Sequence, residues 1–146
     1  MEEIDSFGLK RIEGKVPQSE LLWQGEPIGL KVDGIFIEKQ YRTEVGYLLF
    51  LTENLPYEEG LHIYLLNSER RLLDALELGG PYASAILKDV KPERETALTF
   101  SFFGGDQWRL EVRRVPQAGL NLTLFSPLKF KHRLFARRWL DLRRLS

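Results

Sequence analysis

The sequence has 146 residues, of which 43% are hydrophobic and 29% charged, enough for one domain with a substantial core. It contains no cysteine, which excludes disulfides, cysteine nucleophiles and thiolate metal sites, and no stretch approaches the roughly 18 apolar residues of a membrane-spanning helix. The acidic start at Met1–Asp5 has no apolar run of the signal-peptide kind, so we expect a cytoplasmic protein.

Net charge is zero, but it is unevenly placed along the chain. Residues 127–146 carry seven Lys and Arg against one acid, a net charge of +6, and residues 1–126 carry −6. An acidic body with a basic end is the clearest anomaly in the composition, and it directs attention to the C-terminus as an interaction element.

The first strands are predicted from weak alternation of apolar and polar residues. Phe7–Ile12 and Glu20–Gln24 fit this pattern. Asp33-Gly34 separates Ile28–Val32 from Ile35–Ile37, which is either the turn of a hairpin or a bulge within one long strand.

The middle of the chain gives stronger signals. Tyr47–Thr52 is an almost continuous apolar run, short enough for a strand buried on both faces. Leu61–Leu65 alternates, Asn67–Arg70 has turn composition, and Arg71–Leu78 returns. These segments predict a hairpin next to a buried strand.

The clearest hairpin lies further on. Leu98–Phe103 and Trp108–Arg113 both alternate with period two, and Gly104-Gly105-Asp106 between them is a turn. Ala85–Val90 and Leu120–Phe125 are weaker strands. Turn signals about every 8–12 residues favour a sandwich or barrel over alternating strands and helices.

The C-terminal segment changes character. Ser126 can cap a helix and Pro127 suits its first position, and most apolar residues of the segment fall on one broad helical arc that Lys131 and Arg138 interrupt. Lys129-Phe130-Lys131 alternates and could instead extend the last strand, so we place the helix from about residue 131. We therefore predict a mainly β fold, a single antiparallel meander barrel or sandwich of about eight to ten strands with one C-terminal basic amphipathic helix. Residues 1–126 would form the β domain, and residues 127–146 a helical segment docked on it or on a second subunit.

No catalytic residue, metal site or cofactor is predicted. His62 and His132 are the only histidines, and neither lies in a metal-ligand spacing or beside a nucleophile motif. The acidic stretch Glu53, Asn54, Glu58 and Glu59 lacks the pattern of a calcium loop and is interpreted as a solvated loop. The glycine pairs lack the Lys and Ser/Thr of a phosphate loop.

A pocket is a further hypothesis. Its candidate residues are Asp74, His62, Tyr64 and Trp108. Asp74 shares a strand face with leucines, so its carboxylate must be hydrogen-bonded or solvated, and we expect it either to pair with a nearby Arg or to lie at a strand edge. The aromatic residues either fill the core or line a ligand cavity. Carboxylate chemistry at Asp74 or at Glu53–Glu59 is the corresponding enzyme hypothesis.

The basic segment supplies the main binding hypothesis. Its candidate residues are Lys129, Lys131, Arg133, Arg137, Arg138, Trp139, Arg143 and Arg144. We predict a non-catalytic binding or protein-interaction module whose partner is another protein or a second copy of the chain. The alternatives are a small-molecule-binding β-barrel with an aromatic-lined lumen, and binding of nucleic acid or an anionic membrane surface through residues 127–146.

Overall fold

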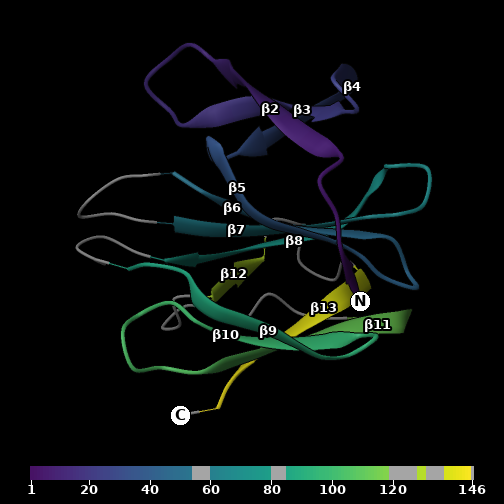
Figure 1. The fold of residues 1–146 in the computed structure, drawn as a ribbon, viewed down its shortest axis with the longest axis vertical. Coiled ribbons are helices and arrows are strands. Elements are labelled where there is room, and N and C mark those ends of the chain that lie inside the picture. Colours follow the sequence, from purple (N-terminus) through teal and green to yellow (C-terminus); the bar gives the residue numbers. More distant parts are fainter. Residues whose placement is uncertain (54–59, 80–84, 119–127, 131–136, 146) are drawn as a thin grey trace.

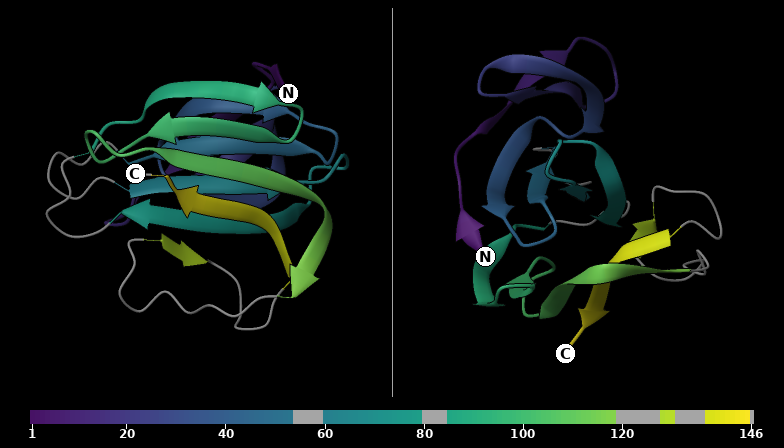
Figure 2. Two further views of the ribbon diagram at one scale, coloured as in Figure 1. Left: turned by 90° about the horizontal axis from the view of Figure 1, so that it is seen from below. Right: turned by 90° about the vertical axis from the view of Figure 1, so that its right-hand side faces the viewer.

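The protein is a stack of three antiparallel β-sheets (Figure 1). The computed structural model describes residues 1–53, 60–79, 85–118, 128–130 and 137–145. All regular structure within those ranges is β, and none of it is a helix that could cross a membrane. The side view in Figure 2 shows the same three layers. A mainly β fold is therefore confirmed.

The middle sheet carries the largest share of the core. Its strand order is β1 (Glu2–Glu3), β5 (Phe36–Arg42), β6 (Tyr47–Thr52), β7 (Gly60–Leu66), β8 (Leu72–Gly79) and β12 (Leu128–Phe130). All of β7 and all but the first residue of β6 are buried, because another sheet covers each face. The doubly buried strand at 47–52 and the hairpin that follows it are confirmed.

A four-stranded sheet covers one face of the middle sheet. Its order is β13 (Arg137–Arg144), β11 (Trp108–Ala118), β10 (Ala97–Ser101) and β9 (Lys88–Arg94). The predicted glycine-turn hairpin is confirmed as β10 and β11, in the register Leu98↔Leu110 and Phe100↔Trp108. These four side chains are buried against the middle sheet, while their neighbours in sequence lie on the outer face.

A three-stranded sheet covers the other face. It is formed by β2 (Phe7–Ile12), β3 (Gln18–Trp23) and β4 (Glu26–Asp33). Phe7, Trp23 and Tyr47 form a mutual ring cluster with centroid distances of 4.8–5.2 Å, which joins this sheet to the middle one.

The Asp33-Gly34 prediction was wrong in both forms. β4 pairs with β3, whereas β5 pairs with β6 in the middle sheet, so the chain changes sheets at this point. Gly34 has φ +111° and donates to the carbonyl of Pro17, and the next residue, Ile35, donates to Thr52 in the other sheet. Glycine permits this sharp change of partner because its positive φ is unstrained.

The C-terminal helix was also wrong where the structure describes the segment. Residues 137–144 form β13, paired with β11 in the register Leu140↔Val112 and Leu142↔Leu110. Arg138, Leu140 and Leu142 alternate as buried residues, a period-two pattern that a helical arc imitates over so short a stretch. Residues 131–136, where the helix was to begin, and the predicted strand Leu120–Phe125 lie outside the described ranges.

The barrel was wrong as well. The described strands form three open sheets instead of one closed one, and they exceed the eight to ten expected. Two packed layers of side chains separate the sheets, and most of the aromatic residues that the structure describes belong to those layers. An aromatic-lined lumen is therefore not part of the described fold, and these aromatic side chains fill core space.

Candidate functional site

Two clusters of ionisable side chains lie on opposite faces of the middle sheet, one of them fully buried and the other partly exposed. In β8, Asp74 faces the four-stranded sheet and Glu77, three residues on, faces the three-stranded sheet. Asp74 pairs in register with Leu65, and Glu77 pairs with His62. The alternation of side chains along β8 thus places Asp74 and Glu77 in two different clusters, one on each face of the sheet.

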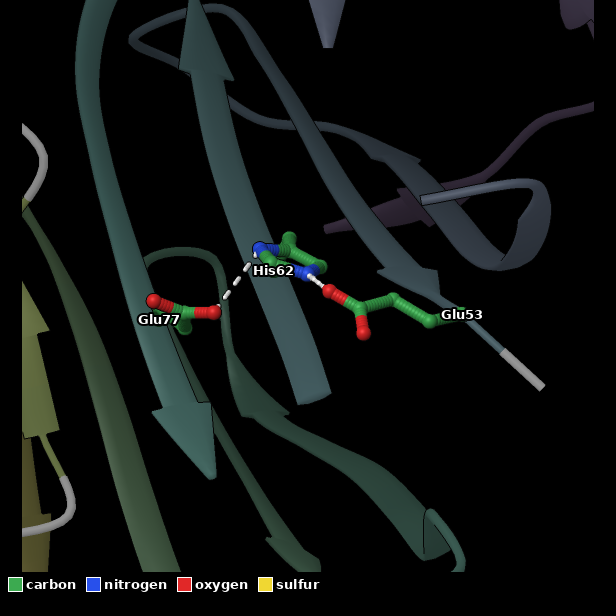
Figure 3. A group of neighbouring side chains, drawn as sticks. All are labelled: Glu53, His62 and Glu77. Atoms are coloured by element: carbon green, nitrogen blue, oxygen red, sulfur yellow. Dashed lines mark hydrogen bonds and ion pairs between the residues drawn. The ribbon is translucent and has the colours of Figure 1, made fainter. Parts of the chain in front are cut away.

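The His62 cluster consists of Glu53, His62 and Glu77 (Figure 3). Nε2 of His62 lies 2.5 Å from Oε1 of Glu53, and Nδ1 lies 3.8 Å from Oε1 of Glu77. The His62 side chain is only 2% exposed, against 15% for Glu53 and 36% for Glu77. A buried imidazole therefore lies between two carboxylates, and the cluster is most open at Glu77.

Strand register places these three side chains together. Leu51 of β6, His62 of β7 and Glu77 of β8 are neighbours in register and so share one face. Glu53 follows Leu51 by two residues and projects to the same side. A Cβ atom at Gly60 would lie 3.2 Å from Oε1 of Glu53 and 3.3 Å from Nε2 of His62, so glycine leaves room for that contact.

Tyr64, two residues after His62 on the same face of β7, links the middle sheet to the three-stranded sheet. Its hydroxyl oxygen accepts a 2.8 Å hydrogen bond from the backbone N–H of Asp33, at the end of β4. Burial raises the pKa of Tyr64 well above its ordinary value, and the charges of Asp33 and Glu77 add to the increase. The phenol is therefore neutral in the physiological range.

The Asp74 clamp is the second cluster, formed by the Asp74 carboxylate and its donors. Nη1 of Arg138 lies 2.9 Å from Oδ1, and the backbone N–H groups of Trp139 and Leu140 donate to Oδ2 at 3.0 and 3.1 Å. The N–H of Ala75 donates to Oδ1 at 2.8 Å. Asp74 is fully buried. Its ion pair with Arg138 confirms the expected pairing with an Arg, and this pair joins β8 to β13.

The clamp also positions Trp139 beside a groove of about 370 Å³, which we call the Trp139 groove. Its lining residues are Glu44, Val45, Asn67, Leu73, Arg114 and Trp139. The apolar residues come from the β5–β6 turn, from β8 and from β13, and Nε of Arg114 lies 2.6 Å from Glu44 at the groove. The groove therefore presents apolar, charged and amide side chains together.

The structure divides the predicted pocket residues between the two faces. His62 and Tyr64 lie on the side of the three-stranded sheet, whereas Asp74 and Trp108 lie in the opposite layer. Trp108 donates from Nε1 to Asp106 at 2.5 Å, within the β10–β11 hairpin. The four residues do not line one pocket.

The basic segment does not present one basic face in the part that the structure describes. Arg138 is buried in the Asp74 clamp, while Arg137, Arg143 and Arg144 are exposed. Arg143 is paired with Asp141 at 3.1 Å. Lys129 lies opposite Glu77 in the β8–β12 register, and Lys131 and Arg133 fall outside the described residues.

Sequence reasoning missed the His62 cluster. Glu53 was assigned to a solvated loop, and Glu77 was not singled out. The available signal was Glu77 itself, a lone carboxylate among leucines in a strand expected to pair with the strand of His62.

Comparisons with protein families, with curated proteins and with solved structures gave no match for this chain.

Proposed function

We propose that this protein is a non-catalytic interaction domain that binds an apolar segment of a partner protein in the Trp139 groove. The observation that supports this most is the position of Trp139, half-buried beside Leu73 and Val45 and fixed from behind by the Asp74 clamp.

The groove has the composition of a binding hot spot. Tryptophan and arginine are enriched at the centres of protein interfaces, where a few residues provide most of the affinity. Here Trp139, Leu73 and Val45 offer apolar surface, and the Glu44–Arg114 pair and Asn67 offer polar contacts. An apolar centre within a polar rim is the usual anatomy of such interfaces.

Preorganisation strengthens the proposal. The backbone N–H of Trp139 and that of Leu140 both donate to the buried Asp74 carboxylate, so this part of β13 is held before any partner arrives. A partner then loses little free energy in ordering the site. The buried clamp thus has a role in presenting Trp139 as well as in joining two sheets.

The size of the groove points to part of a peptide. A volume of about 370 Å³ lies near the lower end of the usual range for ligand sites, about 300–1,000 Å³. One apolar side chain with its flanking backbone fits that range. Charged residues of the peptide beside this apolar side chain could pair with Glu44 and Arg114, which pair with each other in the structure.

Selection from a random peptide library displayed on phage tests the proposal. Selected peptides should share an apolar anchor and bind at least about tenfold more weakly to Trp139→Ala and Leu73→Ser variants. Arg143→Ala, an exposed change away from the groove, is the matched control and should bind as the unaltered chain does. Peptides whose affinity both groove variants leave unchanged would contradict the proposal, as would a library that yields no binder.

The same variants separate the rival partners. Binding of single-stranded DNA or anionic vesicles that falls steeply with salt and is unaffected by Trp139→Ala would favour the basic segment instead. A second copy of the chain in the groove predicts a dimer by light scattering that Trp139→Ala converts to a monomer.

A further inference from the structure

We infer that the His62 cluster is a site for a divalent transition-metal ion such as Zn²⁺, bound by Nδ1 of His62 and the carboxylate of Glu77. Glu53 holds the other ring nitrogen of His62. The inference stands apart from the Trp139 groove and uses none of its residues.

The two nitrogens of the ring face different carboxylates, and their distances differ in kind (Figure 3). The 2.5 Å between Nε2 and Glu53 is a short charge-assisted hydrogen bond, with no room for an ion between the atoms. The 3.8 Å between Nδ1 and Glu77 is too long for a hydrogen bond. Two ligands of a tetrahedral zinc ion, each about 2.1 Å from it, lie about 3.4 Å apart. A small movement of the Glu77 side chain therefore closes this gap to metal-ligand spacing.

Glu53 supplies the support that metal-binding histidines ordinarily have. Such a histidine donates its second ring N–H to a carboxylate or carbonyl, which fixes the tautomer and orientation of the ring. A proton on Nε2, shared with Glu53, leaves the lone pair on Nδ1 directed towards Glu77. Burial of the imidazole between β6 and β8 keeps it in this orientation.

The environment favours a cation of intermediate softness. Two carboxylates beside one imidazole give the cluster a negative charge when the ring is neutral. Imidazole with carboxylate suits Zn²⁺, Co²⁺ or Ni²⁺, whereas Ca²⁺ and Mg²⁺ prefer oxygen ligands alone. Glu77, the most exposed of the three, provides the entry side, and water completes the coordination sphere.

Metal binding to the full chain tests the inference directly. Isothermal titration with Zn²⁺ should give one ion per chain, and long-range ¹H–¹⁵N spectra should show a coordination shift at Nδ1 of His62 while Nε2 keeps its proton. His62 and His132 are the only histidines, so the two rings are readily assigned by a His132→Gln variant. That variant should bind Zn²⁺ like the unaltered chain.

The two carboxylates should respond differently to substitution. Glu77→Gln removes a ligand and should weaken Zn²⁺ binding at least about 100-fold, whereas Glu53→Gln removes only the orienting partner and should weaken it about 10–100-fold. The matched control is Glu38→Gln, a carboxylate that accepts a hydrogen bond from Thr52 near this end of the sheet, and it should change nothing. Glu77 is partly exposed, so its variant should fold, which circular dichroism checks.

Several results would overturn the inference. They are an absence of Zn²⁺ binding in a chain that circular dichroism shows to be folded, coordination through Nε2, loss of binding in His132→Gln, or Glu77→Gln binding as tightly as the unaltered chain. Displacement of Zn²⁺ by equimolar Ca²⁺ would also overturn it, because it would indicate an all-oxygen site in the acidic stretch instead.

Discussion

The two charged clusters on either face of the middle sheet differ in how completely they are enclosed. Within the described part of the chain, the fully buried Asp74 carboxylate accepts hydrogen bonds from the Arg138 side chain and from the backbone N–H groups of Ala75, Trp139 and Leu140, the last two in another sheet. In the His62 cluster, one imidazole is shared by two carboxylates, and Glu77 reaches solvent. The closed cluster joins two sheets, whereas the open one reaches solvent at Glu77. The distinction predicts that removing the Asp74 carboxylate destabilises the fold more than removing the His62 imidazole.

Asp74→Ala should have the largest effect. It leaves the Arg138 guanidinium buried without its carboxylate and removes the acceptor of two β13 N–H groups. We expect a loss of about 3–5 kcal/mol in the free energy of unfolding, measured by urea denaturation. Glu2→Gln is the control, because Glu2 pairs with Arg42 where both side chains are more than half exposed (62% and 58%), and it should cost less than about 1 kcal/mol. Equal losses would show that the clamp is not a closed cluster.

Asp106→Asn tests how much a buried carboxylate contributes to stability through hydrogen bonds alone, without an ion pair. Asp106 accepts bonds from the N–H groups of Phe102 and Phe103 and from Nε1 of Trp108, with no cation partner among the contacts that define the turn. We expect a loss of about 1.5–3 kcal/mol at pH 7, measured by urea denaturation. The loss should be smaller than that of Asp74→Ala, since no buried charge is left behind.

The pH dependence of that variant follows from the pKa of Asp106. Burial alone would raise this pKa, but the bonds from Phe102, Trp108, Phe103 and Ser101 outweigh it and hold the pKa below its ordinary value of 3.8. A lowered pKa stabilises the fold above 3.8, and that contribution is lost as pH falls below it. The difference between Asp106→Asn and the unaltered chain should therefore shrink between pH 5 and pH 2 (about the range given by the linkage relation). Parallel curves would contradict this account.

Local pairing explains which parts of the fold could be predicted from the sequence. The β7–β8 and β10–β11 hairpins join adjacent segments, so alternation and turn composition sufficed. The change of sheet at Gly34 and the pairing of β13 with β11 depend on which distant strand supplies the partner. For β13, the leucines fitted a helical arc as well as a strand face until the register was known.

The candidate sites were harder to predict for the same reason. Asp74 and Arg138 are 64 residues apart, so the sequence indicates that Asp74 needs a partner but does not identify it. The His62 cluster needs the register of β6, β7 and β8 together, because a slip of one residue in any strand would turn its side chain to the other face. No motif encodes that coincidence.

His62→Leu should cost less than either aspartate variant. The leucine fills much of the space of the imidazole, and Glu53 and Glu77 are both partly exposed and can be hydrated. We expect a loss of about 1–2 kcal/mol without metal, measured by urea denaturation. Added Zn²⁺ should widen the difference, because only the unaltered chain gains stability from binding. A metal-free loss as large as that of Asp74→Ala would show that the His62 cluster is closed.

Tyr64→Phe should have the smallest effect at neutral pH. It removes the acceptor of the Asp33 N–H and should cost about 1 kcal/mol. The raised pKa of Tyr64 changes the difference between the two proteins in alkali. A phenol that ionises less readily in the folded than in the unfolded state stabilises the fold below its ordinary pKa of 10.0. That contribution is lost as pH rises above 10.0. Tyr64→Phe should therefore lose less stability than the unaltered chain between about pH 9 and pH 11.5.

Tyr41 supplies an internal reference for this alkaline test. Burial, with the charge of Glu3, raises its pKa to about 12, so it contributes the same alkaline loss to both proteins. Only the difference between the two urea-denaturation curves then reports on Tyr64. A stability curve for Tyr64→Phe that parallels that of the unaltered chain would mean that the phenol ionises as readily in the folded state as in the unfolded one. Tyr64 shares its face with His62 and holds the end of β4, so its ionisation reports on this side of the sheet. The His62 side of the sheet would then be more open to water than its burial indicates, and the contrast with the Asp74 clamp would be larger still.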